Sequence, residues 1–208
     1  MLDTSGDMSE TSWTDLCSSP SATHSVEADV CIVGAGAVGI YLATRLVRYG
    51  RSVVLIEAGP KKAVDAATLG FETIFGLDSY SGATVGRFFG LGGSTTRWGG
   101  ALVPHTEIDW RESDPFAAAW SHILGVVREE APTVIRTLGY QGGSDFDVFA
   151  ERILGQSVRE LQDRGLQVQS GLYLPIWRKN LVSLLNEVKG RITGLRVFFN
   201  AVVKEWDI

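Results

Sequence analysis

The sequence predicts an α/β fold built around a parallel sheet, and three observations support this class. Residues 29–33 form an apolar run that ends in glycine, as in a parallel strand buried on both faces. Residues 37–49 then carry apolar side chains at helical spacing, before Gly50 stops the helix. Residues 52–57 form a second apolar run, which residues 58–60 break. This order predicts two parallel strands joined by a right-handed crossover.

The rest of the chain is less regular. We expect a disordered leader over residues 1–28, which are rich in Ser and Thr, and one domain over residues 29–208. Within it, residues 86–104 form a glycine-rich loop and about 105–190 an irregular helical insertion. Helices are predicted at 123–138, where Pro132 interrupts the pattern, at 145–163 and at 179–189, and a strand at 195–203. The inner face of the first helix is predicted to contain Ile40, Leu42, Ala43, Leu46 and Val47.

Composition narrows the choice of partners and location. The 208 residues carry a net charge of −5 with a pI near 5.2, which argues against a nucleic-acid partner. No apolar run approaches the ~18 residues of a membrane helix, and the leader lacks the apolar region of a secretory signal. Cys17 and Cys31 are interpreted as free thiols in a reducing compartment. We therefore expect a cytoplasmic protein with small-molecule partners and no membrane partner.

The strongest motif is G-x-G-x-x-G over residues 34–39, placed between the first strand and its helix. Gly34 allows a tight turn, Gly36 lets a pyrophosphate approach the backbone, and Gly39 lets the helix pack closely. The helix N-terminus offers N–H groups to phosphates. Glu57 ends the second strand, where a carboxylate binds ribose hydroxyls; a turn that served packing alone would not account for it. The sequence thus predicts a dinucleotide site, formed by Gly34, Ala35, Gly36, Ala37, Val38, Gly39, Glu57 and Ala58.

A second glycine loop over residues 90–100 favours FAD over NAD, because the longer flavin cofactor needs N–H donors beyond the pyrophosphate. The two motifs, with the segments Val103-Pro104, Ile108-Asp109-Trp110 and 200–203, resemble the glucose–methanol–choline (GMC) oxidoreductase family over about residues 29–206. That resemblance implies a Rossmann-like FAD-binding domain, with the substrate domain largely absent. It also implies roles for the following residues: Gly92, Gly93, Ser94 and Thr95 beside the pyrophosphate and ribityl chain, Trp98 and Gly99 near the isoalloxazine, and Val203 at the adenine.

The same resemblance also predicts how the flavin is attached and which reaction it catalyses. Some members link the flavin to a histidine just before the motif's tryptophan; Arg97 stands there, so we expect non-covalent FAD. Trp98 has an alternative interpretation as a core residue, and His105 is interpreted as a solvated loop histidine. The resemblance implies hydride transfer from the CH–OH group of an alcohol or sugar. No catalytic residue is assigned, because nothing matches the family's later base, and no spacing indicates a metal site.

Three alternatives for the whole chain stay open at this point. The chain is either a fragment of a longer enzyme, or a chain that a second polypeptide completes by supplying the substrate half, or a degenerate remnant. Two other functions also remain, an NAD-linked dehydrogenase and a catalytically silent nucleotide-binding or assembly module. Because covering elements would be missing, we expect the apolar strands to leave edges that favour association.

Overall fold

The computed structural model describes residues 11–18, 25–72, 85–106, 109, 115–142, 155–166, 168 and 171–206. The chain forms two compact units, one of Met1–Trp98 with Asn180–Ile208 and one of Gly99–Lys179. The predicted insertion at about 105–190 therefore differs from the observed second unit at both of its boundaries. Among the described residues, no helix combines the length and the apolar character needed to cross a bilayer.

The first unit is built on a parallel sheet in the order β1-β8-β3-β2. Its strands are β1 (Ser12–Asp15), β2 (Val30–Val33), β3 (Val53–Ile56) and β8 (Leu195–Phe199). The sheet confirms the predicted α/β class and the parallel pairing of the first two apolar runs, with Val30 opposite Val53. β3 and β8 are almost completely buried, because each has a strand on both sides.

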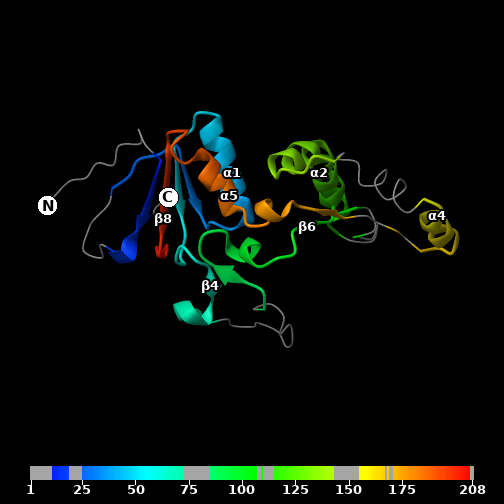
Figure 1. The fold of residues 1–208 in the computed structure, drawn as a ribbon, viewed down its shortest axis with the longest axis horizontal. Helices are drawn as coiled ribbons and strands as arrows, with labels where there is room; N and C mark the ends of the chain where they lie inside the picture. Colours follow the sequence, from blue (N-terminus) through cyan, green and yellow to red (C-terminus); the bar gives the residue numbers. More distant parts are fainter. Residues whose placement is uncertain are drawn as a thin grey trace. The chain divides into compact units, whose positions relative to one another are not determined.

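Helix α1 (Ala37–Arg48) packs against β2, β3 and helix α5 (Val182–Val188), and Figure 1 shows both helices beside the sheet. Ile40, Ala43 and Val47 are buried as predicted. Leu42 is not, since 43% of it is exposed. Thr44 is buried instead, with its hydroxyl donating to the Ile40 carbonyl at 2.9 Å, so a polar residue that satisfies itself within the helix completes the inner face.

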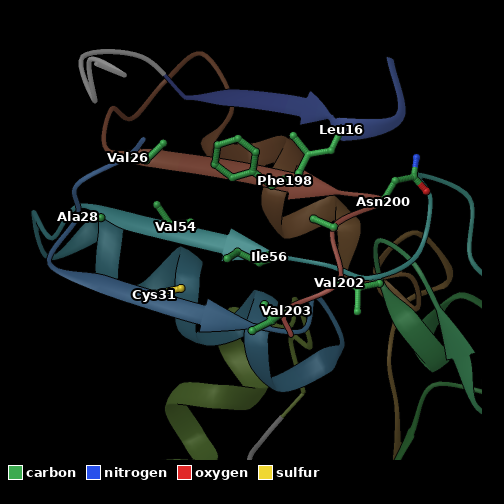
Figure 2. Close-up of a pocket in the computed structure, with 11 residues that line it drawn as sticks. Leu16, Val26, Ala28, Cys31, Val54, Ile56, Phe198, Asn200, Val202 and Val203 are labelled. Carbon is green, nitrogen blue, oxygen red and sulfur yellow. The ribbon is translucent and has the colours of Figure 1, made fainter. Parts of the chain in front are cut away.

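The opposite face of the sheet is only partly covered. Val54, Phe198 and Ala201 form a small core there, against which Leu16, Val26 and Ala28 pack. A cavity of about 510 Å³ opens beside this core, and Figure 2 looks onto it with α1 behind the sheet. The prediction that the strand at 29–33 is buried on both faces is therefore wrong. Cys31 and Val33 alternate with the buried Ile32, and they are exposed because they lie on the partly covered face of the sheet, where Cys31 lines the cavity.

The N-terminal segment also differs from expectation. Residues 12–18 were predicted to lie in a disordered leader, yet they form β1 and the 3-10 helix η1 (Leu16–Ser18). β1 pairs in parallel with β8, and the Asn200 side chain donates to Asp15 Oδ1 at 2.7 Å. Its Trp13 ring lies under two ammonium groups, with Lys189 Nζ 4.4 Å and Lys61 Nζ 5.8 Å from the ring centroid. Pairing with β8 orders a segment that shows no pattern of its own.

The remaining elements of the first unit are short. Strand β4 (Val64–Asp65) pairs antiparallel with β5 (Phe88–Phe89), and two 3-10 helices flank them, η2 (Ala67–Leu69) and η4 (Gly93–Thr96). β8 ends at Phe199, earlier than the predicted residue 203, because Asn200 adopts a left-handed conformation with φ of 55°.

The second unit contains the antiparallel pair β6 (Ala101–Leu102) and β7 (Leu172–Tyr173), the 3-10 helix η6 (Ile176–Arg178), α2 (Ala117–Thr137) and α4 (Gln156–Asp163). α2 begins six residues before the predicted start at residue 123 and contains Pro132 without ending there. α4 confirms the end of the helix predicted at 145–163; residues 145–154 of that prediction lie outside the described residues. The helix predicted at 179–189 is α5, with slightly narrower bounds.

The central position of β3 gives a test of the core. Leu55 is fully buried between β2 and β8, so Leu55→Ala should lower the free energy of unfolding by about 2–5 kcal/mol. Leu42→Ala is the matched control, because this leucine is 43% exposed and its loss should change stability by less than about 0.5 kcal/mol. Urea denaturation followed by circular dichroism measures both. Equal effects of the two substitutions would contradict the assignment of the core.

Candidate cofactor-binding site

The turn between β2 and α1 forms the centre of the candidate site. Gly34 follows β2 with φ of 97°, and its N–H donates to the Ile56 carbonyl of β3 at 2.7 Å. Gly36 is the N-cap of α1, and its carbonyl accepts the first helical hydrogen bond, from the N–H of Ile40 at 3.0 Å. The N–H groups of the first helical turn, including those of Ala37 and Val38, have no intrahelical carbonyl to bind. They offer donors and a partial positive charge to an anion.

The glycines of this turn meet two different requirements. A β-carbon on Gly39 would lie 1.9 Å from the Gly34 carbonyl oxygen, so the helix can pack on the turn only when position 39 lacks a side chain. A β-carbon on Gly36 would meet nothing within 4 Å. Gly39 is thus required by packing, whereas the space above Gly36 is free for a ligand. This is the division of roles that the fingerprint predicts.

Glu57 follows β3 directly and is only 5% exposed. Its carboxylate accepts three main-chain hydrogen bonds, from Ala35 to Oε2 at 2.7 Å, from Gly59 to Oε1 at 2.9 Å and from Gly90 to Oε1 at 2.8 Å. The predicted ribose contact stays a prediction. Since a carboxylate has about four lone-pair positions, these bonds leave it about one for a ribose hydroxyl. Ala58, the next residue, is half-buried.

The second glycine loop lies directly against the first. The Gly92 N–H donates to the Ala35 carbonyl at 2.9 Å, and a β-carbon on Gly93 would lie 3.2 Å from Gly36 Cα. Thr95 is buried, and its hydroxyl donates to the Gly92 carbonyl at 2.6 Å while it accepts the Leu181 N–H at 3.2 Å. The structure therefore brings the predicted residues of both loops together.

Two side chains of the second loop, Ser94 and Arg97, contact the segment that precedes the loop. The Ser94 hydroxyl donates to the Gly86 carbonyl at 2.8 Å and accepts the Phe88 N–H at 3.3 Å. The Arg97 guanidinium lies over the Phe88 ring, 4.2 Å from its centroid. Ser94 and Arg97 are exposed, whereas Thr95 between them is buried, so the side chains of η4 and its C-cap face different sides of the loop.

The other predicted site residues, Trp98, Gly99 and Val203, lie away from the contact between the two loops. Trp98 is half-buried and ends the first unit, while Gly99 is exposed and begins the second. Val203 lies beyond β8 and lines the cavity on the open face of the sheet together with Ile56 (Figure 2). The Ala201 N–H, two residues earlier, donates to the Glu57 carbonyl at 2.9 Å and so holds this segment beside the end of β3.

Sequence reasoning missed two features of the site. Gly90 was not among the predicted residues, although its N–H binds Glu57. The contact of Asn200 with Asp15 was also missed, because residues 12–18 were assigned to the leader. The role of Gly90 has a sequence signal, because this glycine lies two residues before the predicted Gly92. The contact between Asn200 and Asp15 has no sequence signal.

His105 was interpreted as a loop histidine, and the structure shows that it has a partner. Its Nδ1 lies 3.2 Å from Asp109 Oδ2, which also accepts the Thr106 N–H at 2.7 Å. The Thr106 N–H and then His105 hold the pKa of Asp109 below its usual value. The His105 side chain remains 64% exposed. Within the described part of the chain, no group of three or more His, Cys, Asp or Glu could hold a metal ion.

Comparison with known proteins assigns the family. A family model described as FAD dependent oxidoreductase, DAO, matches residues 29–207. The FAD-dependent oxidoreductase dbaF of Emericella nidulans is 40% identical over 77 residues, which are 35% of this chain and 16% of that relative. The chain thus matches only a small part of the relative's length. The expected membership of the GMC family is wrong, since the matching family is a different one and glycine loops of this kind do not separate the two.

The tight contact at Gly39 gives a test of the turn. Gly39→Ala should destabilise the first unit by several kcal/mol, because its methyl group would overlap the Gly34 carbonyl oxygen. Gly36→Ala is the matched control; its methyl group meets no protein atom within 4 Å, so the urea midpoint should stay near that of the parent. Denaturation of both proteins without cofactor checks this. A Gly39→Ala protein as stable as Gly36→Ala would show that the turn is not packed as described.

Proposed function

We propose, from the premise that the chain belongs to the FAD dependent oxidoreductase family, that its first unit is the part of a flavin-dependent oxidoreductase that holds FAD non-covalently. The fingerprint loop and the first turn of α1 would bind the pyrophosphate through Gly34 to Gly39. Glu57 and Ala58 would lie at the adenosine ribose and Val203 at the adenine. Gly92, Gly93, Ser94 and Thr95 would follow the cofactor toward the ribityl chain, with Trp98 and Gly99 nearer the flavin ring.

The observation that supports this proposal most is the contact between the two glycine loops. The Gly92 N–H binds the Ala35 carbonyl at 2.9 Å, and Gly93 lies against Gly36. A single extended ligand can therefore meet main-chain amides from both loops. The open space over Gly36 supports the same proposal, because a pyrophosphate must approach the backbone there without meeting a side chain.

FAD held by these residues would supply the redox chemistry, namely the acceptance of a hydride from the substrate. We propose the CH–OH group of an alcohol or sugar as the donor, on the pattern of Trp98 and the Asp109-Trp110 segment alone. The described residues would bind and orient the cofactor, and we assign none of them as the catalytic base. Turnover of alcohols or sugars, and not of amines, in the assembled enzyme tests the substrate class.

A second polypeptide that supplies the substrate half is a further part of this proposal. It is supported by the partly covered apolar face of the sheet, where Val54, Phe198 and Ala201 form only a small core. The proposed location is the cytoplasm, supported by two cysteines that are both exposed and free. Small-molecule substrates remain the proposed partners, without nucleic acid or membrane.

Cofactor retention tests the proposed site. Gly36→Val should abolish retention of FAD, because the side chain would occupy the space that the pyrophosphate needs. Gly125→Val is the matched control, since Gly125 lies in α2 and its β-carbon would also meet nothing within 4 Å. Flavin released by heat denaturation of each purified protein is measured by fluorescence.

We expect the parent and Gly125→Val to release about one FAD per chain and Gly36→Val to release none. Flavin that stays attached to the denatured protein would contradict non-covalent binding. NAD in place of flavin in the parent would favour a nicotinamide-linked dehydrogenase. Equal flavin release from Gly36→Val and Gly125→Val would contradict the site.

A further inference from the structure

Three chain segments meet at one buried carboxylate. Glu57 ends β3, Ala35 belongs to the fingerprint loop, and Gly90 begins the second glycine loop; Gly59 completes the set of donors. Ala35 is fully buried, and Glu57 is 5% exposed. Within the described residues, no Lys, Arg or His nitrogen lies within 4.0 Å of this carboxylate. Its charge is therefore stabilised by main-chain N–H groups, which a buried carboxylate requires when it has no cation.

The two oxygens of Glu57 bind different segments. Oε2 accepts the Ala35 N–H at 2.7 Å, whereas Oε1 accepts the N–H groups of Gly59 at 2.9 Å and Gly90 at 2.8 Å. One side chain thus joins the fingerprint loop to the second glycine loop, which is 33 residues away from Glu57 in sequence. A main-chain hydrogen bond joins the same two segments, since the Leu91 N–H donates to the Pro60 carbonyl at 3.2 Å.

We propose that Glu57 is a positioning residue that holds the two glycine loops together, and that it acts on affinity through these loops more than through the ribose beside which it would lie. All three hydrogen bonds join groups of this chain, and they occupy most of the acceptor positions of the carboxylate. A loop held in its binding geometry loses less entropy when the ligand arrives. The ligand measurements below rest on the proposed function, whereas the exchange measurements do not.

Glu57→Gln separates these roles because an amide has one acceptor oxygen. If that oxygen keeps Gly59 and Gly90, the amide NH₂ faces the Ala35 N–H, and the reverse orientation loses the other two bonds. Either orientation breaks the link between the loops. Asp29→Asn is the matched control. The Asp29 carboxylate also accepts a main-chain hydrogen bond, from Ser52 at 2.8 Å, but at the opposite end of β2 and β3.

The first readout is amide hydrogen exchange of the full-length chain, followed by NMR without any ligand. In Glu57→Gln, exchange at Ala35 or Gly90 should be about 10-fold to 100-fold faster, the factor expected for losing a hydrogen bond to a charged group. Exchange of Val53, which pairs with Gly194 within the first unit, should not change. Asp29→Asn should leave Ala35 and Gly90 like the parent. Unchanged exchange at both positions in Glu57→Gln would overturn the proposal.

The second readout compares ADP with 2′,3′-dideoxy-ADP, which lacks both ribose hydroxyls. If Glu57 acts through the loops, Glu57→Gln should weaken both ligands by a similar factor of about 10. A loss confined to ADP would overturn the proposal in favour of a ribose contact. If the parent binds neither ligand, the proposed function fails, and the exchange result still decides whether Glu57 joins the loops.

A third variant covers the case in which Glu57→Gln does not fold. Glu57→Asp keeps the charge and both acceptor oxygens but is one methylene shorter, so it cannot reach Ala35 and Gly90 at once. It should show faster exchange at one of these two amides with an unchanged rate at Val53. Parent-like exchange at both amides in a folded Glu57→Asp protein would overturn the proposal.

Discussion

The close packing of α1 on the turn after β2 is the constraint on which the candidate site depends. There is no room for a β-carbon at Gly39 beside the Gly34 carbonyl oxygen, so the helix axis begins immediately at the end of the strand. That placement directs the first-turn N–H groups toward the carboxyl ends of the parallel strands, where ligands of open α/β sheets bind. Glu57 at the end of β3 and the segment after β8 reach the same edge, because all four strands run in one direction.

At this edge, main-chain polar groups bind one another and one side-chain carboxylate, that of Glu57. The fingerprint loop is held by the Gly34 N–H on Ile56, the second loop by the Gly92 N–H on Ala35, and both by Glu57. Such bonds depend on backbone geometry, which explains most of the density of glycine: apart from Gly36 and Gly99, each glycine position in the two loops either has a positive φ or brings two backbones close together. The same density explains why the family could not be resolved from these loops. Different flavoprotein families face one physical problem and use similar glycine patterns to meet it.

The sequence predicted the helices and strands that a local pattern of residues determines. The apolar runs at 29–33 and 52–57, the helical spacing between them and the apolar strand from Leu195 are all local patterns, and the structure contains each of these elements. β1 could not be predicted, because Ser12–Asp15 becomes a strand only through its pairing with β8. The early start of α2 has a similar cause: Ala117–Ala119 favour a helix without giving it a period. Of the main-chain partners of Glu57, Gly90 is indicated only by its place in the second glycine loop, and Ala35 and Gly59 are not distinguished as partners, since every residue except proline has an N–H group.

The pairing of β8 with both β1 and β3 has a consequence for synthesis on the ribosome. β8 contributes the interior strand between them, yet it is translated long after β1, β2 and β3, and the Asn200–Asp15 contact joins residues 185 positions apart. Until β8 leaves the exit tunnel, the apolar edge of β3 has no partner in the described sheet. Non-local pairing of this kind is slow and leaves nascent chains prone to aggregation. The sheet should therefore close only after β8 has been translated, which makes the yield of folded protein sensitive to chaperone supply and to growth temperature.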